Sequence, residues 1–296
     1  MQLEPFFERF DALLQSPKRF VLACHVNPDG DAIGSVLAMS EFLRGYGHET
    51  KMVVANDFPD FLHWMPGAEE FLVFEKDAEA CKNAIAASEC IVMMDFNNLS
   101  RGGILHNEIG KTRCPRVLID HHRDPDESQF YCLYSDTCVS SASEIATEII
   151  LHYGKERLTE SIATNLLVGI MTDTGAFAHS IYHPRTFELV SLLVEKSMPY
   201  NLIHQLVYDT VSENRLRLLG FSISERMELL DDYSTAIIAL SKSDLARFDY
   251  HVGDTEGYPR APYPSQAKRR TVSSEIGTTE ESCHRTGGAH QCRPLR

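Results

Sequence analysis

The chain has 296 residues, of which 43% are hydrophobic and 24% are charged, so it can bury a sizeable core in one large or two ordinary domains. Its formal net charge of −14 argues against a broad nucleic-acid-binding surface, but it does not exclude small anionic substrates. The N-terminus carries no apolar run typical of a signal peptide, and no run of about 18 apolar residues predicts a membrane span. We therefore expect a cytoplasmic protein that does not act on membranes.

Strand-like and helix-like patterns alternate along the first part of the chain. The strand-like runs lie at 19–26, 50–57, 90–96 and 116–122, and the helical patterns lie at 32–47, 77–88, 140–154 and 159–175. The helix at 140–154 opens with Ser141 and Glu144 in the spacing of a capping box. Alternation of this kind predicts an α/β fold whose parallel sheet has helices on both faces. The strand runs are continuously apolar, as expected for strands that are covered on both faces.

Acidic and imidazole side chains gather where these elements end. They are His25, Asp29, Asp31, Asp95, Asp120, His121, His122 and Asp173. Each has an ordinary alternative, since NPDGD is a turn sequence and a single Asp often caps a helix. In parallel α/β sheets, however, ligands bind beyond the carboxyl ends of the strands, where these residues are expected to meet.

The composition of this set indicates its chemistry. Carboxylates with neutral imidazoles suit Mn²⁺, Mg²⁺ or Zn²⁺. The chain contains no C-x-x-C pair, the pattern that would indicate a thiolate metal site. Five Asp and three His are more than one metal ion needs. Two ions about 3.5–4 Å apart that share one carboxylate could employ these residues as ligands, and such a pair would suit phosphate ester hydrolysis.

The second part of the chain is less regular. A helical stretch at about 185–228 leads into a second unit, with a strand at 233–241 and a helix that begins near 242. From Tyr258 onward, Val, Ile, Leu, Met, Phe and Trp together occur only three times. The segment contains seven Lys or Arg and three Glu, so its net charge is +4. Such a segment cannot bury enough apolar surface to fold, and we expect it to be mostly disordered. The predicted organisation is a first domain at 1–190, a linker at 191–219, the beginning of a second domain at 220–257, and an aberrant tail at 258–296.

Four segments resemble the motifs of a known family. HVNPDGDAIGS, MMDFNNLSR, LIDHHRD and MTDTGAFAHS are similar to motifs I to IV of the DHH phosphoesterases, in the same order. The resemblance covers about residues 1–255 and is strongest to the bacterial branch in which a smaller α/β DHHA1 domain follows the DHH domain. That branch contains oligoribonucleases (nanoRNases) that also dephosphorylate 3'-phosphoadenosine 5'-phosphate (pAp).

The resemblance implies a role for each residue of the set. It implies that His25 and Asp29 hold one Mn²⁺, that Asp31, His121 and Asp173 hold the other, and that Asp95 bridges the two. It further implies that Asp120 fixes the neighbouring ligands and that His122 faces the scissile phosphate. Arg101 and His179 are the candidates for substrate contact.

The expected function is hydrolysis of short oligoribonucleotides to mononucleotides, or removal of the 3'-phosphate of pAp, by water activated between two Mn²⁺, with Mg²⁺ as an alternative. The DHHA1 domain of the family carries a GGGH segment, and here TGGAHQ at 286–291 has Ala289 in place of a glycine. A reading-frame change near residue 257 would explain this tail. A chain that binds metal but is largely inactive is therefore one alternative, and a cyclic-dinucleotide phosphodiesterase is another. An exonuclease, a pyrophosphatase and a homodimeric state also remain open.

Overall fold

The structure is a computed structural model that describes residues 4–180, 182–210, 212–230, 235–251 and 254–255. The expected disordered tail, the TGGAHQ segment and the proposed frame change lie outside the described residues. The chain forms two compact units, and the second begins at Ser212. Of the segment expected to be a linker, residues 191–211 belong to the first unit and 212–219 to the second, and the predicted domain boundaries stay predictions.

The first unit contains, in chain order, α1 (Glu4–Leu14), β1 (Arg19–Ala23), α2 (Gly30–Arg44), β2 (Glu49–Val54), η1 (Asp60–Leu62), η2 (Ala68–Glu70), β3 (Leu72–Val73), α3 (Ala78–Ala87), β4 (Cys90–Met94), η3 (Leu99–Gly102), α4 (Leu105–Gly110), β5 (Arg116–Asp120), η4 (Glu127–Gln129), β6 (Cys132–Ser135), α5 (Ala142–His152), η5 (Lys155–Arg157), α6 (Glu160–Asp173), α7 (Arg185–Lys196), α8 (Tyr200–His204) and the π-helix η6 (Gln205–Asp209). The second contains α9 (Glu213–Glu225), β7 (Met227–Leu230), β8 (Thr235–Ile238) and α10 (Lys242–Arg247).

The six strands of the first unit form one parallel sheet in the order β3-β2-β1-β4-β5-β6. This confirms the predicted α/β fold class. The sequence patterns did not predict β3 and β6, because β3 has only two residues and β6 is a short edge strand that includes polar side chains. The strand order reverses between β1 and β4. In open parallel sheets such a switch point forms a crevice at the carboxyl ends of the strands.

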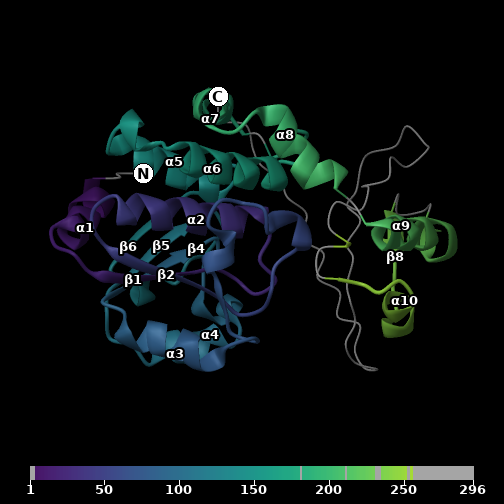
Figure 1. Cartoon of the computed structure of the whole chain (residues 1–296), viewed down its shortest axis with the longest axis horizontal. Helices are drawn as coiled ribbons and strands as arrows, with labels where there is room; N and C mark the ends of the chain where they lie inside the picture. The colour runs from purple at the N-terminus through teal and green to yellow at the C-terminus, as the bar shows by residue number, and fades with distance from the viewer. Residues whose placement is uncertain (1–3, 181, 211, 231–234, 252–253, 256–296) are drawn as a thin grey trace. The chain divides into compact units, whose positions relative to one another are not determined.

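Helices cover both faces of the sheet (Figure 1). On one face α2, α5 and α6 share a large apolar core with the strands, and on the other face α3 and α4 pack over a smaller core. Nearly every residue of α2 is buried, as expected for a helix that is covered on all sides. A Cβ on Gly34 of α2 would run into the backbone carbonyl of Asn165 in α6. The absence of a side chain at Gly34 therefore lets the two helices lie in close contact.

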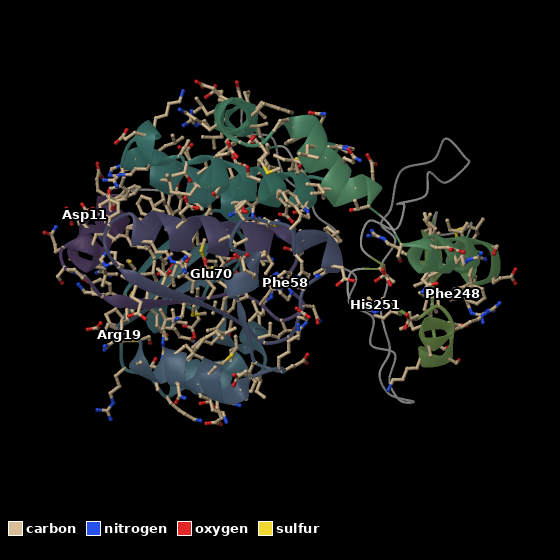
Figure 2. All side chains as sticks on the ribbon, viewed as in Figure 1. Asp11, Arg19, Phe58, Glu70, Phe248 and His251 are labelled. Carbon is tan, nitrogen blue, oxygen red and sulfur yellow. The ribbon has the colours of Figure 1, made fainter. Side chains whose placement is uncertain are left out.

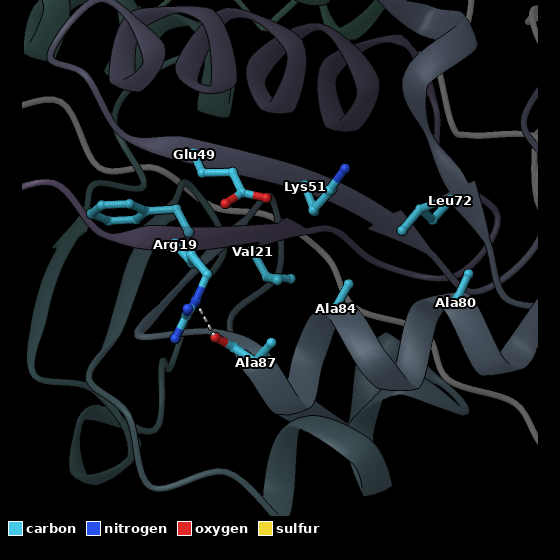
Figure 3. A pocket seen from close by; sticks show the side chains of 9 residues that line it. Arg19, Val21, Glu49, Lys51, Leu72, Ala80, Ala84 and Ala87 are labelled. Carbon is cyan, nitrogen blue, oxygen red and sulfur yellow. Dashed lines mark hydrogen bonds between the residues drawn. The ribbon is translucent and has the colours of Figure 1, made fainter.

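The face covered by α3 carries a cavity of about 320 Å³ (Figure 3). Small side chains of α3, among them Ala84 and Ala87, leave this space against β1 and β2. Arg19 at its edge donates a hydrogen bond to the Ala87 carbonyl at 2.9 Å and pairs with Glu89 at 3.6 Å. Because Arg19 and Glu49 are the first residues of β1 and β2, the cavity lies near the amino ends of these strands. It is therefore separate from the edge where the predicted ligands lie.

Helix α1 closes the side of the sheet next to β6. Phe6 and Phe10 are buried, and Phe6 packs edge-on against Tyr134 of β6. Asp11, labelled in Figure 2, accepts a hydrogen bond from the Tyr153 hydroxyl at 2.6 Å, just beyond the end of α5. Among the described residues, none of the helices has the length and apolar content that crossing a membrane would require.

The second unit is a helix, an antiparallel hairpin and a short helix. The predicted strand and the helix start at 242 are confirmed by β8 and α10. The helical stretch expected at about 185–228 contains α7, α8, η6 and α9, and it ends at Glu225, because Met227 begins β7, a strand that the sequence patterns did not predict. Arg226 pairs with Asp244 through two hydrogen bonds of 3.0 and 2.8 Å, and Asp244 also completes a capping box with Ser241. This ion pair joins the two helices of the unit.

Candidate metal centre

The loop after β1 supplies the first two predicted ligands. His25 Nδ1 lies 2.8 Å from the Val26 carbonyl, so this nitrogen carries the proton and leaves Nε2 to face the site. Asp29 is the N-cap of α2, and its Oδ1 accepts hydrogen bonds from the backbone N–H groups of Asp31 and Ala32 at 3.0 and 3.1 Å. The same oxygen is 4.0 Å from His25 Nε2. The turn sequence NPDGD thus serves as a helix cap and as one wall of a polar site.

Asp31 lies in the first turn of α2 and is fully buried. Its Oδ2 accepts a hydrogen bond from the Ala142 N–H at 2.6 Å, and its Oδ1 accepts one from the Ser143 N–H at 2.8 Å. Both donors belong to the first turn of α5. This buried carboxylate is therefore held by the amino end of a second helix, whose dipole favours negative charge.

Asp95 follows β4 with a φ of +61°, a conformation that Asp tolerates better than most side chains. Its Oδ2 lies 3.3 Å from His25 Nε2, and its Oδ1 lies 3.3 Å from His121 Nε2. One carboxylate thus stands between a histidine from the β1 loop and a histidine from the β5 loop. This is the arrangement that the resemblance implies for a bridging ligand.

The end of β5 supplies three neighbouring residues with different surroundings. Asp120 is the last residue of β5 and is fully buried, and its Oδ1 lies 2.7 Å from His122 Nδ1. Its Oδ2 accepts the His122 backbone N–H at 3.1 Å. His121 lies against the His122 ring, with its Nε2 3.5 Å from Asp173 Oδ2 and 4.0 Å from Asp31 Oδ2. Asp120 therefore orients His122, while His121 joins the cluster of carboxylates.

Three overlapping groups of side chains have ligand atoms that all lie within 4.8 Å of one another. They are His25 with Asp29 and Asp95, Asp31 with His121 and Asp173, and Asp95 with His121 and His122. The first two correspond to the ligand sets that the resemblance implies, with Asp95 beside both. His122 Nδ1 is 3.6 Å from Asp95 but only 2.7 Å from Asp120, so we assign this nitrogen to Asp120 and not to the cluster.

Two observations fit a divalent cation at this place. Asp95 Oδ1 is buried and accepts no hydrogen bond from the described residues, although His121 Nε2 lies 3.3 Å away. A buried carboxylate oxygen without a partner is costly, and a cation between the two atoms would satisfy both. The donor set is also suitable, because oxygen and imidazole ligands are the ones that Mn²⁺ and related ions take.

The crowding of charge shifts the proton affinities of the cluster. Burial raises the pKa of Asp173 to about 7, and burial also raises the pKa of Asp31 well above its ordinary value. Burial acts to lower the pKa of His121, but the carboxylates around it dominate and raise it to about 10, and His25 is raised in the same way to about 9. Burial opposes ionisation of Asp95, yet the two histidines hold its pKa below the usual range. Without a cation, the cluster therefore holds protons that a metal would displace.

The two predicted substrate contacts lie beside these loops. Arg101 is in η3, and its backbone carbonyl accepts a hydrogen bond from the Val26 N–H at 2.9 Å, which joins the loops after β4 and β1. His179 follows a left-handed turn in which Gly175, Ala176 and Phe177 all have positive φ. A Cβ on Gly175 would run into the His179 ring, so the ring lies against that glycine. His179 is not in any of the three ligand groups among the described residues.

Sequence reasoning missed the contribution of α5. The Ser141 and Glu144 spacing marked the start of the helix, but the capping box is only half formed. Ser141 Oγ accepts the Glu144 N–H at 3.0 Å, whereas the Glu144 carboxylate accepts the N–H of Ser140 at 2.9 Å. Nothing in the local pattern indicated that the next two amides bind Asp31, more than a hundred positions earlier.

The chain matches a known protein family. The model of the "DHH family, N-terminal domain" matches residues 19–170, which is more than half of the chain and includes every strand of the sheet. The chain belongs to the DHH family. A solved structure described as an exopolyphosphatase-related protein from Bacteroides fragilis has the same fold. It is 32% identical, with a TM-score of 0.83 over 89% of this chain and 77% of that one.

Curated DHH relatives extend the comparison. A Streptococcus mutans protein named "Probable bifunctional oligoribonuclease and PAP phosphatase NrnA" is 26% identical over 258 residues, which cover 86% of this chain and 77% of that protein. The "Uncharacterized protein MG371 homolog" of Mycoplasma pneumoniae is 30% identical over 209 residues, 69% of this chain. The aligned part spans 59% of that relative's length. The Streptococcus mutans relative supports the nanoRNase branch that the motifs resemble.

Proposed function

We propose that the chain is a metal-dependent phosphoesterase that hydrolyses short oligoribonucleotides to mononucleotides, removes the 3'-phosphate of pAp, or does both. The observation that carries this proposal is the position of Asp95 between His25 and His121, with further carboxylates on either side. Membership of the DHH family and relatives named as oligoribonuclease and PAP phosphatase support the substrate class.

The proposed ligand sets follow the two separate groups. His25 and Asp29 would hold one cation, and the second would be held by Asp31, His121 and Asp173. Asp95 would contact both, one carboxylate oxygen facing each histidine. We propose Mn²⁺, with Mg²⁺ as the alternative, because all of these ligands offer oxygen or imidazole nitrogen. Two bound cations supply a nucleophile activated from water and neutralise charge on the phosphate.

His122 is the proposed contact to the scissile phosphate. Asp120 binds its Nδ1 and its backbone N–H, which fixes the ring and leaves Nε2 to face the substrate. About a third of the His122 side chain is exposed (34%), whereas Asp120 is fully buried, so the imidazole is the accessible member of the pair. In its protonated form His122 can donate a hydrogen bond to a phosphate oxygen as charge develops there.

Arg101 and His179 are proposed to contact the rest of the substrate. Arg101 lies in the loop that contacts the His25 loop, and His179 lies six residues after Asp173, on a turn whose shape Gly175 permits. A cationic and an imidazole side chain on two rims of the centre would suit a second phosphate or a ribose. A homodimer stays a prediction.

The test is Mn²⁺-dependent release of phosphate from pAp and of mononucleotides from a dinucleotide RNA, with a cyclic dinucleotide as the competing substrate. The full chain is compared with Asp95→Asn and with Asp60→Asn, an exposed carboxylate in η1 that is outside the ligand groups. The proposal requires turnover that Asp95→Asn abolishes and Asp60→Asn retains. Mn²⁺ binding without turnover of any of the three substrates would favour the inactive, metal-binding alternative.

A further inference from the structure

Asp31 and the amino end of α5 are joined more tightly than a helix cap requires. Ser141 already caps this helix by accepting the Glu144 N–H. The two remaining amides of the first turn, from Ala142 and Ser143, both bind Asp31, one to each carboxylate oxygen. With both oxygens held, the carboxylate plane of Asp31 is set by the position of α5.

Space for this contact is left by α6. A Cβ on Gly169 would run into Ser143 Oγ and would approach Asp31 Oδ1 to 3.0 Å. The lack of a side chain at Gly169 therefore lets α5 and α2 meet at Asp31, next to the helix that carries Asp173. Helices α2, α5 and α6 therefore meet around the buried Asp31 carboxylate.

Glu144 is the group that fixes this end of α5. It is 1% exposed, and its Oε2 accepts hydrogen bonds from the backbone N–H and the hydroxyl of Ser140 at 2.9 and 2.6 Å. The hydroxyl of Thr186, at the start of α7, donates to the same carboxylate at 3.1 and 3.2 Å. Ser140 and Thr186 are themselves buried. Glu144 thus ties the residue before the helix cap and the beginning of α7 to the first turn of α5.

We propose that Glu144 is a positioning residue for Asp31. By holding Ser140 and Thr186 it keeps the Ala142 and Ser143 amides at the place where they orient the Asp31 carboxylate toward its cation. The inference rests on the proposed function, in which Asp31 is a metal ligand. It adds a buried acid that lies outside the ligand groups and acts on one of the two cation sites only.

Helix α5 itself offers the matched control. Glu148 lies one turn after Glu144 and also connects α5 to α7, through two hydrogen bonds from Arg185 at 2.7 and 3.0 Å. Among the described residues, no hydrogen bond joins it to Ser140 or to the amides at Asp31. A general loosening of α5 against α7 would therefore follow from Glu148→Ala as well as from Glu144→Ala.

The experiment is titration of the metal-free full chain with Mn²⁺ by calorimetry, with folding checked by circular dichroism. Asp31→Asn and Asp29→Asn first identify which binding event belongs to each cation. We expect Glu144→Ala to weaken the Asp31 event by about 10- to 100-fold, the usual effect of losing a partner that orients a ligand, and to spare the Asp29 event. Glu144→Gln should recover most of the affinity, because its amide oxygen can still accept from Ser140. Glu148→Ala should change neither event.

If Glu144→Ala does not fold, a second variant tests the link from the α5 amides to Asp31, on which the proposal depends. Ala142→Pro removes the N–H that binds Asp31 Oδ2, at the first helical position, where proline is accepted. Ser141 before it has φ −165° and ψ 161°, the extended conformation that proline requires of its predecessor. We expect Ala142→Pro to weaken the Asp31 event, and Glu160→Pro, at the first position of α6, to leave it unchanged.

The outcomes separate this inference from the proposed function. If the wild-type chain binds no Mn²⁺, or Asp31→Asn binds it as the wild type does, the proposed function fails and the inference fails with it. If Asp31→Asn loses one event while folded Glu144→Ala, or Ala142→Pro in its place, keeps both, only the inference is overturned. Equal weakening by Glu144→Ala and Glu148→Ala would also overturn it.

Discussion

Asp95 and His121 approach each other to 3.3 Å between Oδ1 and Nε2, yet the buried oxygen accepts no hydrogen bond from the described residues. The other oxygen of Asp95 lies at the same distance, 3.3 Å, from His25 Nε2. Atoms that converge in this way on a common point are typical of ligands around a cation.

The first prediction concerns this carboxylate. Asp95→Asn should weaken both Mn²⁺ binding events, because Asp95 shares one ligand group with His25 and Asp29 and another with His121, which lies 3.3 Å away. Mn²⁺ affinity should fall by more than about 100-fold. Removing a residue that only hydrogen-bonds to a metal ligand already lowers metal affinity by up to about 100-fold, and loss of a ligand should lower it further. Calorimetric titration of the metal-free chain measures it. Two unchanged events in Asp95→Asn would contradict the bridging role, and Asp60→Asn serves as the control.

The outline of this site could be predicted from the sequence because parallel α/β sheets gather the carboxyl ends of their strands at one edge. His25, Asp95 and His121 each follow an apolar run that could be recognised as a strand. The local patterns did not indicate which atoms face each other, since that depends on strand order. β6 and β3 were missed because runs of four and two residues carry little periodicity. The hold of α5 on Asp31 could not be predicted, because backbone amides leave no trace in residue type.

The second prediction separates Asp120 from the ligands. Asp120→Asn should lower kcat for phosphate release by about 10²- to 10³-fold, the range for losing one donor to the developing charge, because His122 loses its orienting carboxylate. Both Mn²⁺ events should remain, since Asp120 is in none of the ligand groups. Steady-state kinetics on pAp and a Mn²⁺ titration of the same preparation measure the two effects. Loss of metal binding together with turnover would make Asp120 part of the metal centre itself.

The third prediction concerns pH and metal binding. The metal-free cluster holds protons near neutrality, because the pKa of His25 is about 9, that of His121 about 10 and that of Asp173 about 7. A cation must displace these protons, so apparent Mn²⁺ affinity should rise from pH 6 to pH 8. Calorimetry in two buffers of different ionisation enthalpy should show protons released on binding. Affinity that is flat or falls over this range would contradict the prediction.

The same shifts set the sign for stability without metal. His25 and His121 have folded-state pKa values above the ordinary 6.5, so their contribution is complete below that pH and is lost as the pH rises through about 9 to 10. Asp173 acts in the same direction, because its raised pKa makes the folded state hold a proton up to about pH 7. Chelator-treated protein should therefore unfold at lower urea at pH 8.5 than at pH 6, and Mn²⁺ should reduce the difference. A higher midpoint at pH 8.5 without metal would contradict this sign.

The last prediction concerns the close contact between α2 and α6. Gly34→Ala should destabilise the fold by about 1–3 kcal/mol, the usual cost of inserting a methyl group where the neighbour cannot move, because the new Cβ would meet the backbone of Asn165. The two helices carry Asp31 and Asp173, so separating them should also weaken the Mn²⁺ event that these residues share. Urea unfolding and Mn²⁺ titration measure the two effects.

Gly110→Ala is the control, since a Cβ there meets no described atom within 4 Å. Alanine has the better helix propensity, so this control should be neutral or stabilising by up to about 1 kcal/mol. Equal effects of the two substitutions would show that propensity, and not the helix contact, decides the result.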